Sequence, residues 1–202
     1  MNFRFEDKLK LNNKKIYEFN EWLLKNNVVQ AYPPREIYSI YFDNDNLQTY
    51  HDSNEGIVPR LKIRFRTYNY DSINSNNFFM EIKKTLYFGR LKSSVKILNF
   101  KKYLKLGIFI RGYGICYPKL IVKYDRSYFR MNKIRITLDQ NIRFKKYENL
   151  MNNSFFENFK DLVIPEIKYS SKNHLGKFEN NLPFEKTRFS KYCIGAEKLN
   201  LI

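Results

Sequence analysis

The segment Arg60–Arg66 reads R-L-K-I-R-F-R, with a cation at every second position and an apolar residue in each gap. Side chains of a β-strand point alternately to its two faces, so this segment predicts a strand with four cations on one face and Leu61, Ile63 and Phe65 on the other. Charges that simply face water give the same pattern. Four like charges on one face repel each other, however, and a bound polyanion explains them better than solvent does.

Charged residues at spacing two recur along the chain. A Glu-x-Lys triplet occurs three times, at Glu6–Lys8, Glu81–Lys83 and Glu166–Lys168, and Arg135–Asp139 also places polar groups at spacing two. A carboxylate in such a strand forms either a cross-strand ion pair or a ligand for Mg²⁺ or Mn²⁺, which prefer oxygen ligands. Three copies on separate strands favour the functional interpretation. If these faces converge, they form a polar, mostly cationic cavity suited to a polyphosphate and its metal ion.

The composition limits the class of protein. The 202 residues suit one domain, and an apolar content of 43% with 17% aromatic residues excludes a disordered chain. The 37 basic and 20 acidic residues give a net charge of +17, which attracts an anionic partner of some kind. Two cysteines and two histidines, without metal-ligand spacing, argue against a zinc site. There is no signal peptide pattern and no apolar run of membrane-spanning length, so we expect a cytoplasmic protein.

The remaining patterns predict strands in an antiparallel meander with a few short helices, hence one α+β, mainly antiparallel β domain over residues 1–202. The spacing of Ile16, Phe19 and Leu23 predicts a helix over 13–26, capped by Asn12 or Asn13. The polar stretch 69–77 is expected to be a hairpin tip. Further helices are expected over 99–106 and 154–161, and a short helix or a turn over 47–52. Strands are expected over 3–11, 36–43, 57–68, 78–85, 90–97, 118–130, 133–139 and 162–169.

Phosphate groups would have to be bound by side-chain cations, because neither G-x-x-x-x-G-K-[ST] nor G-x-G-x-x-G occurs in the chain. Tyr124, Arg126 and Tyr128 share one face of their predicted strand, so Arg126 and Arg135 are candidates to face one interior. An arginine packed on a tyrosine at the surface is the alternative.

Several motifs follow one another over almost the whole chain: R-x-E-x-K at Arg4–Lys8, Y-P-P-R-x-I-x-S-I-Y-F-D at Tyr32–Asp43, R-x-K-x-R-x-R at Arg60–Arg66, E-x-K at Glu81, Y-x-R at Tyr124, R-x-T-x-D at Arg135, E-I-K at Glu166 and R-F-S-K-Y at Arg188. In this order they resemble the VTC domain, the polyphosphate polymerase branch of the triphosphate tunnel metalloenzyme superfamily. Arg4 departs from the E-x-E-x-K of the related cyclase and thiamine-triphosphatase branch and removes one possible metal carboxylate.

The resemblance implies a closed eight-stranded β-barrel with flanking short helices, whose polar interior binds a triphosphate and Mn²⁺ or Mg²⁺. It implies that the γ-phosphoryl group of ATP is transferred to a growing inorganic polyphosphate, releasing ADP. The residues that it assigns are Lys8, Arg64, Arg66, Lys83, Arg126 and Arg135 as tunnel cations, Glu166 as metal ligand, and Arg188, Ser190 and Lys191 as phosphate-binding residues. The Glu-x-Lys triplets add Glu81 and Glu6 as further candidate metal ligands and Lys168 as a further candidate for phosphate binding. Arg60 and Lys62 are expected to guide anions to the tunnel mouth.

Two other functions stay open. A triphosphatase of the same fold would use water in place of the phosphate acceptor. A non-catalytic module that binds polyanions or nucleic acid would use the net charge alone. Phe65, the one aromatic residue of Arg60–Arg66, alternates with the cations and does not share their face, which disfavours base stacking and so a specific nucleic-acid partner. Polyphosphate export would require a separate membrane protein, and we expect a monomer or weak oligomer.

Overall fold

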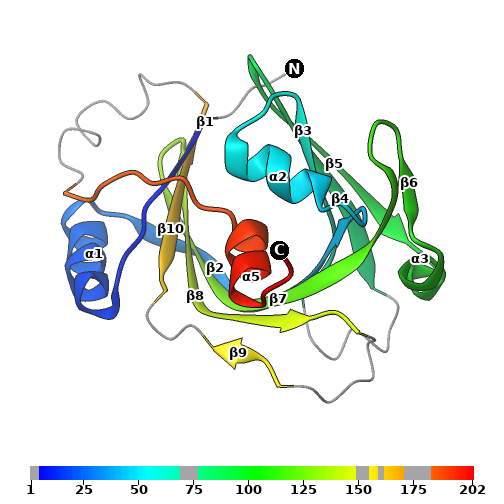
Figure 1. The fold of residues 1–202 in the computed structure, drawn as a ribbon. Coiled ribbons are helices and arrows are strands. Elements are labelled where there is room, and N and C mark those ends of the chain that lie inside the picture. The colour runs from blue at the N-terminus through cyan, green and yellow to red at the C-terminus, as the bar shows by residue number, and fades with distance from the viewer. Residues whose placement is uncertain (1–4, 69–76, 149–154, 159–161, 171–182) are drawn as a thin grey trace. The chain divides into compact units, whose positions relative to one another are not determined.

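The computed structural model describes residues 5–68, 77–148, 155–158, 162–170 and 183–202 (Figure 1). The predicted hairpin tip at 69–77 lies outside these residues except for Asn77, as do Arg4 and His174. The chain forms two compact units. Unit 1 comprises Met1–Arg35, Tyr124–Ile142 and Asn158–Phe189, and unit 2 comprises Glu36–Lys123, Arg143–Glu157 and Ser190–Ile202.

Antiparallel strands dominate the described residues, together with four helices. The strands are β1 (Phe5–Lys8), β2 (Val29–Asp43), β3 (Arg60–Thr67), β4 (Phe78–Leu86), β5 (Gly89–Ile97), β6 (Ile108–Ile110), β7 (Gly114–Met131), β8 (Ile134–Lys146), β9 (Glu157–Asn158) and β10 (Ile164–Tyr169). The helices are α1 (Asn13–Lys25), α2 (Gln48–Glu55), α3 (Phe100–Leu106) and α5 (Lys191–Lys198).

The hydrogen-bonded strand order is β1-β10-β8-β7-β2-β3-β4-β5, with β6 paired to β7 and β9 to β8. The α+β, mainly antiparallel class is therefore as predicted. Strands β1 and β5 stand at the two ends of this order, and among the described residues no pairing joins them. The predicted closure into a barrel is not confirmed.

The core of unit 1 is formed by α1 together with one face of strands β10 and β8. Asn12 caps the helix, since its side-chain oxygen accepts a hydrogen bond from the Lys15 amide at 2.9 Å. The apolar residues at helical spacing pack with alternate residues of the strands into one core, which includes Phe19, Trp22, Ile136 and Ile167. Burial of every second strand residue on this side leaves the intervening polar residues of β8 and β10 on the opposite face.

Unit 2 has the same division of faces in β3. Ile63 and Phe65 are fully buried in a core with Tyr38, Ile40 and Phe78, as the alternation in the sequence predicted. The residues between them, Lys62, Arg64 and Arg66, therefore lie on the other face of the sheet.

Helix α5, the last element of unit 2, is anchored to a buried carboxylate at the end of β2. Asp43 is fully buried and accepts hydrogen bonds from the amides of Asn44, Thr49 and Tyr50, from the Thr49 hydroxyl, and from the Tyr192 hydroxyl at 2.6 Å. Five donors satisfy both carboxylate oxygens, so this buried charge is well compensated. Burial together with this charge raises the pKa of Tyr192, which keeps its proton.

Most predicted elements are present, with shifted ends, but three predictions need correction. Residues 154–161 are not a helix where they are described, because Glu157–Asn158 is a strand paired with β8. Strand β2 is longer than the predicted 36–43, because it starts at Val29, before the Tyr32-Pro33-Pro34 sequence. Strand β8 is longer than the predicted 133–139, because it continues to Lys146. Helix α5 and strand β6 were not predicted. The longest described helix, α1, has 13 residues, and no described helix combines the length and hydropathy of a membrane span.

Candidate functional site

Cations from three neighbouring strands of unit 2 form a continuous patch, which we call the cationic face: Lys62, Arg64 and Arg66 of β3, Lys83 of β4 and Lys92 of β5. Lys62 is the cross-strand partner of Lys83, and Lys83 is the partner of Lys92. Cross-strand partners point to the same side of a sheet, so three lysines stand in one row. Like charges placed this way repel each other, which makes the row unfavourable unless an anion is close to it.

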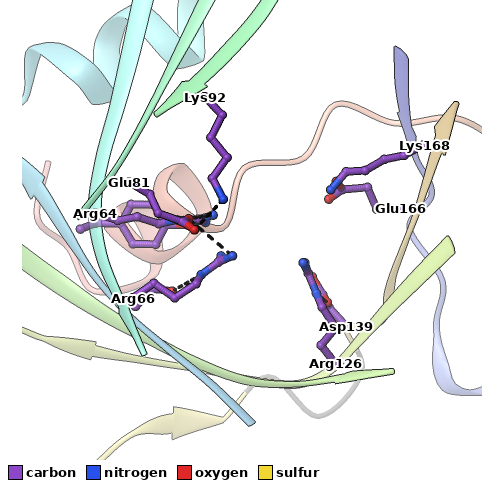
Figure 2. A network of polar contacts seen from close by, with 10 residues as sticks. Arg64, Arg66, Glu81, Lys92, Arg126, Asp139, Glu166 and Lys168 are labelled. Carbon is purple, nitrogen blue, oxygen red and sulfur yellow. Dashed lines mark hydrogen bonds and ion pairs between the residues drawn. The ribbon is translucent and has the colours of Figure 1, made fainter. Parts of the chain in front are cut away.

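Glu81 supplies one internal anion to this face. It is the cross-strand partner of Arg64 and is only 3% exposed. As Figure 2 shows, Arg64 donates to its Oε2 through Nε at 2.8 Å and through Nη2 at 2.6 Å, and Lys92 donates to Oε1 at 2.6 Å. Arg66 lies 3.5 Å from Oε2. Three cations around one carboxylate leave this cluster with a net charge of +2.

The cations keep Glu81 ionised. Burial by itself would raise the pKa of this carboxyl, but Arg64, Arg66 and Lys92 outweigh burial and lower the pKa to about 2. A carboxylate with this pKa stays charged throughout the physiological range. It therefore holds the arginine side chains in place without supplying or removing a proton.

Two residues of the cationic face also donate hydrogen bonds to residues outside strands β3, β4 and β5, one at the start of helix α5 and one in strand β2. Lys62 donates to the hydroxyl of Ser190, the residue that caps α5, at 2.8 Å. Arg64 donates through Nη1 to the Tyr41 hydroxyl at 3.0 Å, and the Tyr41 ring stacks on the Tyr192 ring with 5.4 Å between centroids. Tyr192 is in turn fixed by Asp43. The C-terminal helix thus positions cations that are distant in the sequence.

In unit 1 two Glu-x-Lys triplets lie on neighbouring strands. In the antiparallel register of β1 and β10, Glu6 is the partner of Lys168, and Lys8 is the partner of Glu166. Lys168 lies 2.6 Å from Glu166, and Lys8 lies 3.4 Å from Glu6. Both carboxylates are at most 9% exposed. The register places the four charges on the same side of this sheet in alternating sign.

The residues beside Glu166 fit a hard divalent cation. Thr137 is the cross-strand partner of Glu166, and its buried hydroxyl oxygen has no hydrogen-bond partner among the described residues. A buried oxygen without a partner is unfavourable, and next to the Glu166 carboxylate it fits the oxygen ligands that Mg²⁺ or Mn²⁺ prefers. The described part of the chain contains no group of three or more His, Cys, Asp or Glu residues suited to hold a metal, so any such ion needs further oxygen ligands from its substrate or from water.

Arg126 and Asp139 form a second charged pair in unit 1 (Figure 2). Asp139 is fully buried and accepts from Nε of Arg126 at 2.5 Å and from Nη2 at 2.7 Å. The Arg126 guanidinium lies 5.4 Å from the centroid of the buried Tyr124 ring. Burial favours the neutral form of Arg126, but Asp139 outweighs it and raises the pKa of Arg126 well above its usual value. This bidentate contact fixes the plane of the guanidinium.

Other predicted residues are placed as follows. Arg60 donates to the backbone oxygens of Gly56 and Ile57, so it is held at the start of β3. Arg135 is exposed at the start of β8 and is the cross-strand partner of Lys168. Arg188 is exposed in unit 1, whereas Lys191 and its neighbour Ser190 begin α5 in unit 2. The metal candidates are likewise divided: Glu6 and Glu166 belong to unit 1 and Glu81 to unit 2.

Sequence reasoning missed four residues that organise these clusters. Lys92 carried a usable signal, because Arg90, Lys92 and Lys96 all fall at even spacings and so on one face of a strand, as the cations of β3 do. Tyr41 and Tyr192 were visible only as members of the motifs at Tyr32–Asp43 and Arg188, because a ring stack between residues 151 positions apart depends on the tertiary fold. Thr137 was visible only as part of the R-x-T-x-D motif.

Comparison with known proteins supports one family. The sequence profile of the VTC domain matches residues 3–106 and 100–200. No curated protein matches the chain.

Solved structures share the fold at low sequence identity. A candidate adenylate cyclase from Bacillus halodurans has a TM-score of 0.59 and 12% identity over 94% of this chain and 96% of that chain. A candidate adenylyl cyclase from Hippeastrum with a dominant triphosphatase activity has a TM-score of 0.57 and 12% identity over 96% of this chain and 95% of that chain. A candidate adenylate cyclase from Vibrio parahaemolyticus has a TM-score of 0.53 and 13% identity over 95% and 97%. The fold is that of the triphosphate tunnel proteins, and the chain belongs to the VTC domain family.

Proposed function

We propose that the chain is a metal-dependent polyphosphate polymerase that transfers the γ-phosphoryl group of ATP to an inorganic polyphosphate. The observation that carries this proposal is the lysine row of Lys62, Lys83 and Lys92, which lies beside Arg64 and Arg66 with one buried carboxylate among them. A protein has little reason to align like charges in register unless a polyanion neutralises them. A triphosphate is such a polyanion, and arginine and lysine are its usual ligands.

The residues of each unit have distinct roles in this mechanism. In unit 2, Arg64, Arg66 and the lysine row bind phosphate oxygens, while Glu81 and Ser190 hold the cations in position. In unit 1, Arg126 is oriented by Asp139 to contact phosphate. Glu166, Glu6 and Thr137 would hold Mg²⁺ or Mn²⁺, whose positive charge offsets the negative charge of the phosphoryl oxygens.

The reaction requires no nucleophile from the protein. A terminal oxygen of the acceptor polyphosphate forms a bond to the γ-phosphorus while the bond from that phosphorus to the β,γ-bridging oxygen breaks, and ADP leaves with that oxygen. The acceptor grows by one phosphate group. Such a transfer depends on positioning and on charge neutralisation, which fixed arginine and lysine side chains provide.

The test is incubation of the purified protein with ATP and Mn²⁺ or Mg²⁺, with polyphosphate resolved on a gel and ADP quantified. We expect Arg64→Ala to lower the rate about 10²–10³-fold, as loss of one electrostatic donor does elsewhere. Lys83→Ala and Lys84→Ala form a matched pair, because Lys84 is exposed and lies on the opposite face of the same strand. Only Lys83→Ala should be impaired. Equal activity of Arg64→Ala, Glu166→Gln and the unmodified protein would refute the assignment.

Triphosphate hydrolysis is the second candidate, favoured by the triphosphatase activity of the Hippeastrum protein that shares the fold. The same gel separates the two reactions. Long chains together with ADP indicate polymerisation, whereas orthophosphate and ADP without chains indicate hydrolysis. Binding of ATP without turnover would instead favour the non-catalytic polyanion-binding module.

A further inference from the structure

Unit 1 contains an open cavity of about 340 Å³ at the turn between β7 and β8. Four cations from three strands and the turn line it: Arg130, Lys133, Arg135 and Lys168. Asn132 shapes the turn, with a φ of 48° that asparagine tolerates better than most residues. We call this site the cationic cavity. Its size is within the range of about 300–1,000 Å³ that small-molecule sites occupy.

The charges of the cationic cavity are poorly balanced. None of the described residues that line it is acidic, and Arg130, Lys133 and Arg135 have no ion-pair partner among the described residues. Elsewhere on the surface, lysines pair with acids, as Lys123 does with Glu36 and Lys119 with Asp45. Three arginine or lysine side chains converging without a counter-charge favour an anionic ligand with several charges.

Lys168 connects the cationic cavity to the Glu166 cluster. Its amine lies 2.6 Å from Glu166, and it is the cross-strand partner of both Glu6 and Arg135. The Lys168 side chain can therefore contact both an anion in the cavity and Glu166, the carboxylate that we assign to the metal ion. Arg130, near the end of β7, and Lys133, in the turn to β8, belong to none of the motifs that indicate triphosphate binding.

We propose that the cationic cavity binds the phosphate groups of an inorganic polyphosphate beyond the three nearest the metal, so that Arg130 and Lys133 give the protein a preference for long over short polyphosphates. This inference rests on the proposed function. Nucleic acid is the less favoured ligand, because Tyr169, the aromatic residue that lines the cavity, is 5% exposed and stacks on Phe5. It offers no face to a base.

The test compares the Arg130→Gln/Lys133→Gln double variant with Lys101→Gln/Lys102→Gln, which removes the same charge from exposed positions of α3. Binding of inorganic tripolyphosphate, long-chain polyphosphate and a single-stranded RNA is measured by calorimetry with Mn²⁺ present. We expect the first variant to lose about tenfold or more in affinity for long-chain polyphosphate, because two charged contacts are lost. Its affinity for tripolyphosphate should be unchanged, and the control variant should bind every ligand as the unmodified protein does.

Three results would overturn the inference: equal losses for tripolyphosphate and the long chain, the same loss in the α3 variant, or an equally large loss for RNA. The first two would indicate an effect of total charge, and the third a general polyanion surface. Failure of the proposed function looks different, since the unmodified protein would then form no long chains from ATP in the gel assay, whatever the binding affinities of the variants.

Discussion

At the scale of single residues, Glu81 decides how the cationic face holds together. Its two oxygens contact Arg64, Arg66 and Lys92, so it turns mutual repulsion between neighbouring strands into attraction. Buried charges that lose one partner destabilise a fold by several kcal/mol, typically about 3–5. Glu81 is therefore important for stability as well as for the orientation of the arginines.

Glu81→Gln should lower the free energy of unfolding, and the loss should depend on pH. The folded pKa of about 2 lies below the usual 4.5, so the stabilising contribution is complete above pH 4.5 and disappears as the pH falls towards 2. Between pH 5 and pH 3 the stability difference between the two proteins should shrink by about 2 kcal/mol. Urea unfolding at several pH values measures it. A difference that is constant over this range would show that the ion pairs do not stabilise the fold.

The alternation of residue types predicted on which face of β3 the arginines lie, but not which residues they contact. Arg64 and Arg66 were placed on the polar side of β3 by alternation alone, and the structure agrees. The sequence left Glu81 as either a metal ligand or an ion-pair partner. The contacts with Lys92 and Arg64 depend on the β3-β4-β5 register, which a single strand pattern does not contain.

At the scale of elements, helix α5 combines a stability role with a positioning role. Gly195 packs so closely against Phe144 that an added Cβ would lie 2.6 Å from the ring. The missing side chain therefore allows the helix to approach strand β8 closely. Asp43 holds the first turn through Tyr192, and Ser190 caps the helix and contacts Lys62. A change at the start of α5 should therefore affect the cationic face as well as the helix.

Tyr192→Phe tests the anchoring of α5. It removes the 2.6 Å hydrogen bond to Asp43 and leaves a buried oxygen with one donor fewer, which should cost about 1–3 kcal/mol in unfolding free energy. The ring stack with Tyr41 is kept. Tyr87→Phe, at an 85% exposed position, is the control and should be neutral. Equal urea midpoints for the two variants would argue against the anchor.

Elements with strong periodicity were predicted well, and short ones were not. Strand β3 and helices α1 and α3 show clear spacings of two or of three to four, and all three are present. Helix α5 has only eight residues, among them Gly195, and its stability comes from Asp43 and Phe144. Contacts of this kind outweigh local preference, so the sequence of 191–198 alone does not indicate a helix.

At the scale of the whole molecule, the net charge of +17 dominates encounters with polyanions. Such a charge accelerates association with ligands of opposite sign, and salt screens it. The Debye length falls from about 10 Å at 0.1 M salt to about 3 Å at 1 M.

If the proposed reaction takes place, kcat/KM for a long polyphosphate acceptor should fall about tenfold between roughly 0.05 M and 0.5 M potassium chloride, while kcat changes much less. Steady-state kinetics at constant Mn²⁺ concentration measure both quantities. A flat kcat/KM over this range would mean that capture of the acceptor does not depend on the overall charge of the protein.

The order of motifs along the chain was sufficient to recognise the family, because every motif except R-F-S-K-Y, which leads into α5, contributes to its own strand, and these strands occur in the expected sequence. Closure of the sheet was not predictable in the same way. It depends on whether the edge strands β1 and β5 pair, and a short strand such as Phe5–Lys8 carries too little pattern to decide this.

The carboxylate of Glu81 also bears on when the protein can acquire its native structure. A sheet of arginines and lysines would otherwise depend on a bound anion to offset the repulsion between its strands. Because this chain carries a compensating anion on the middle strand, we expect β3, β4 and β5 to associate without an anionic ligand. Refolding of the protein from urea should then need no added phosphate.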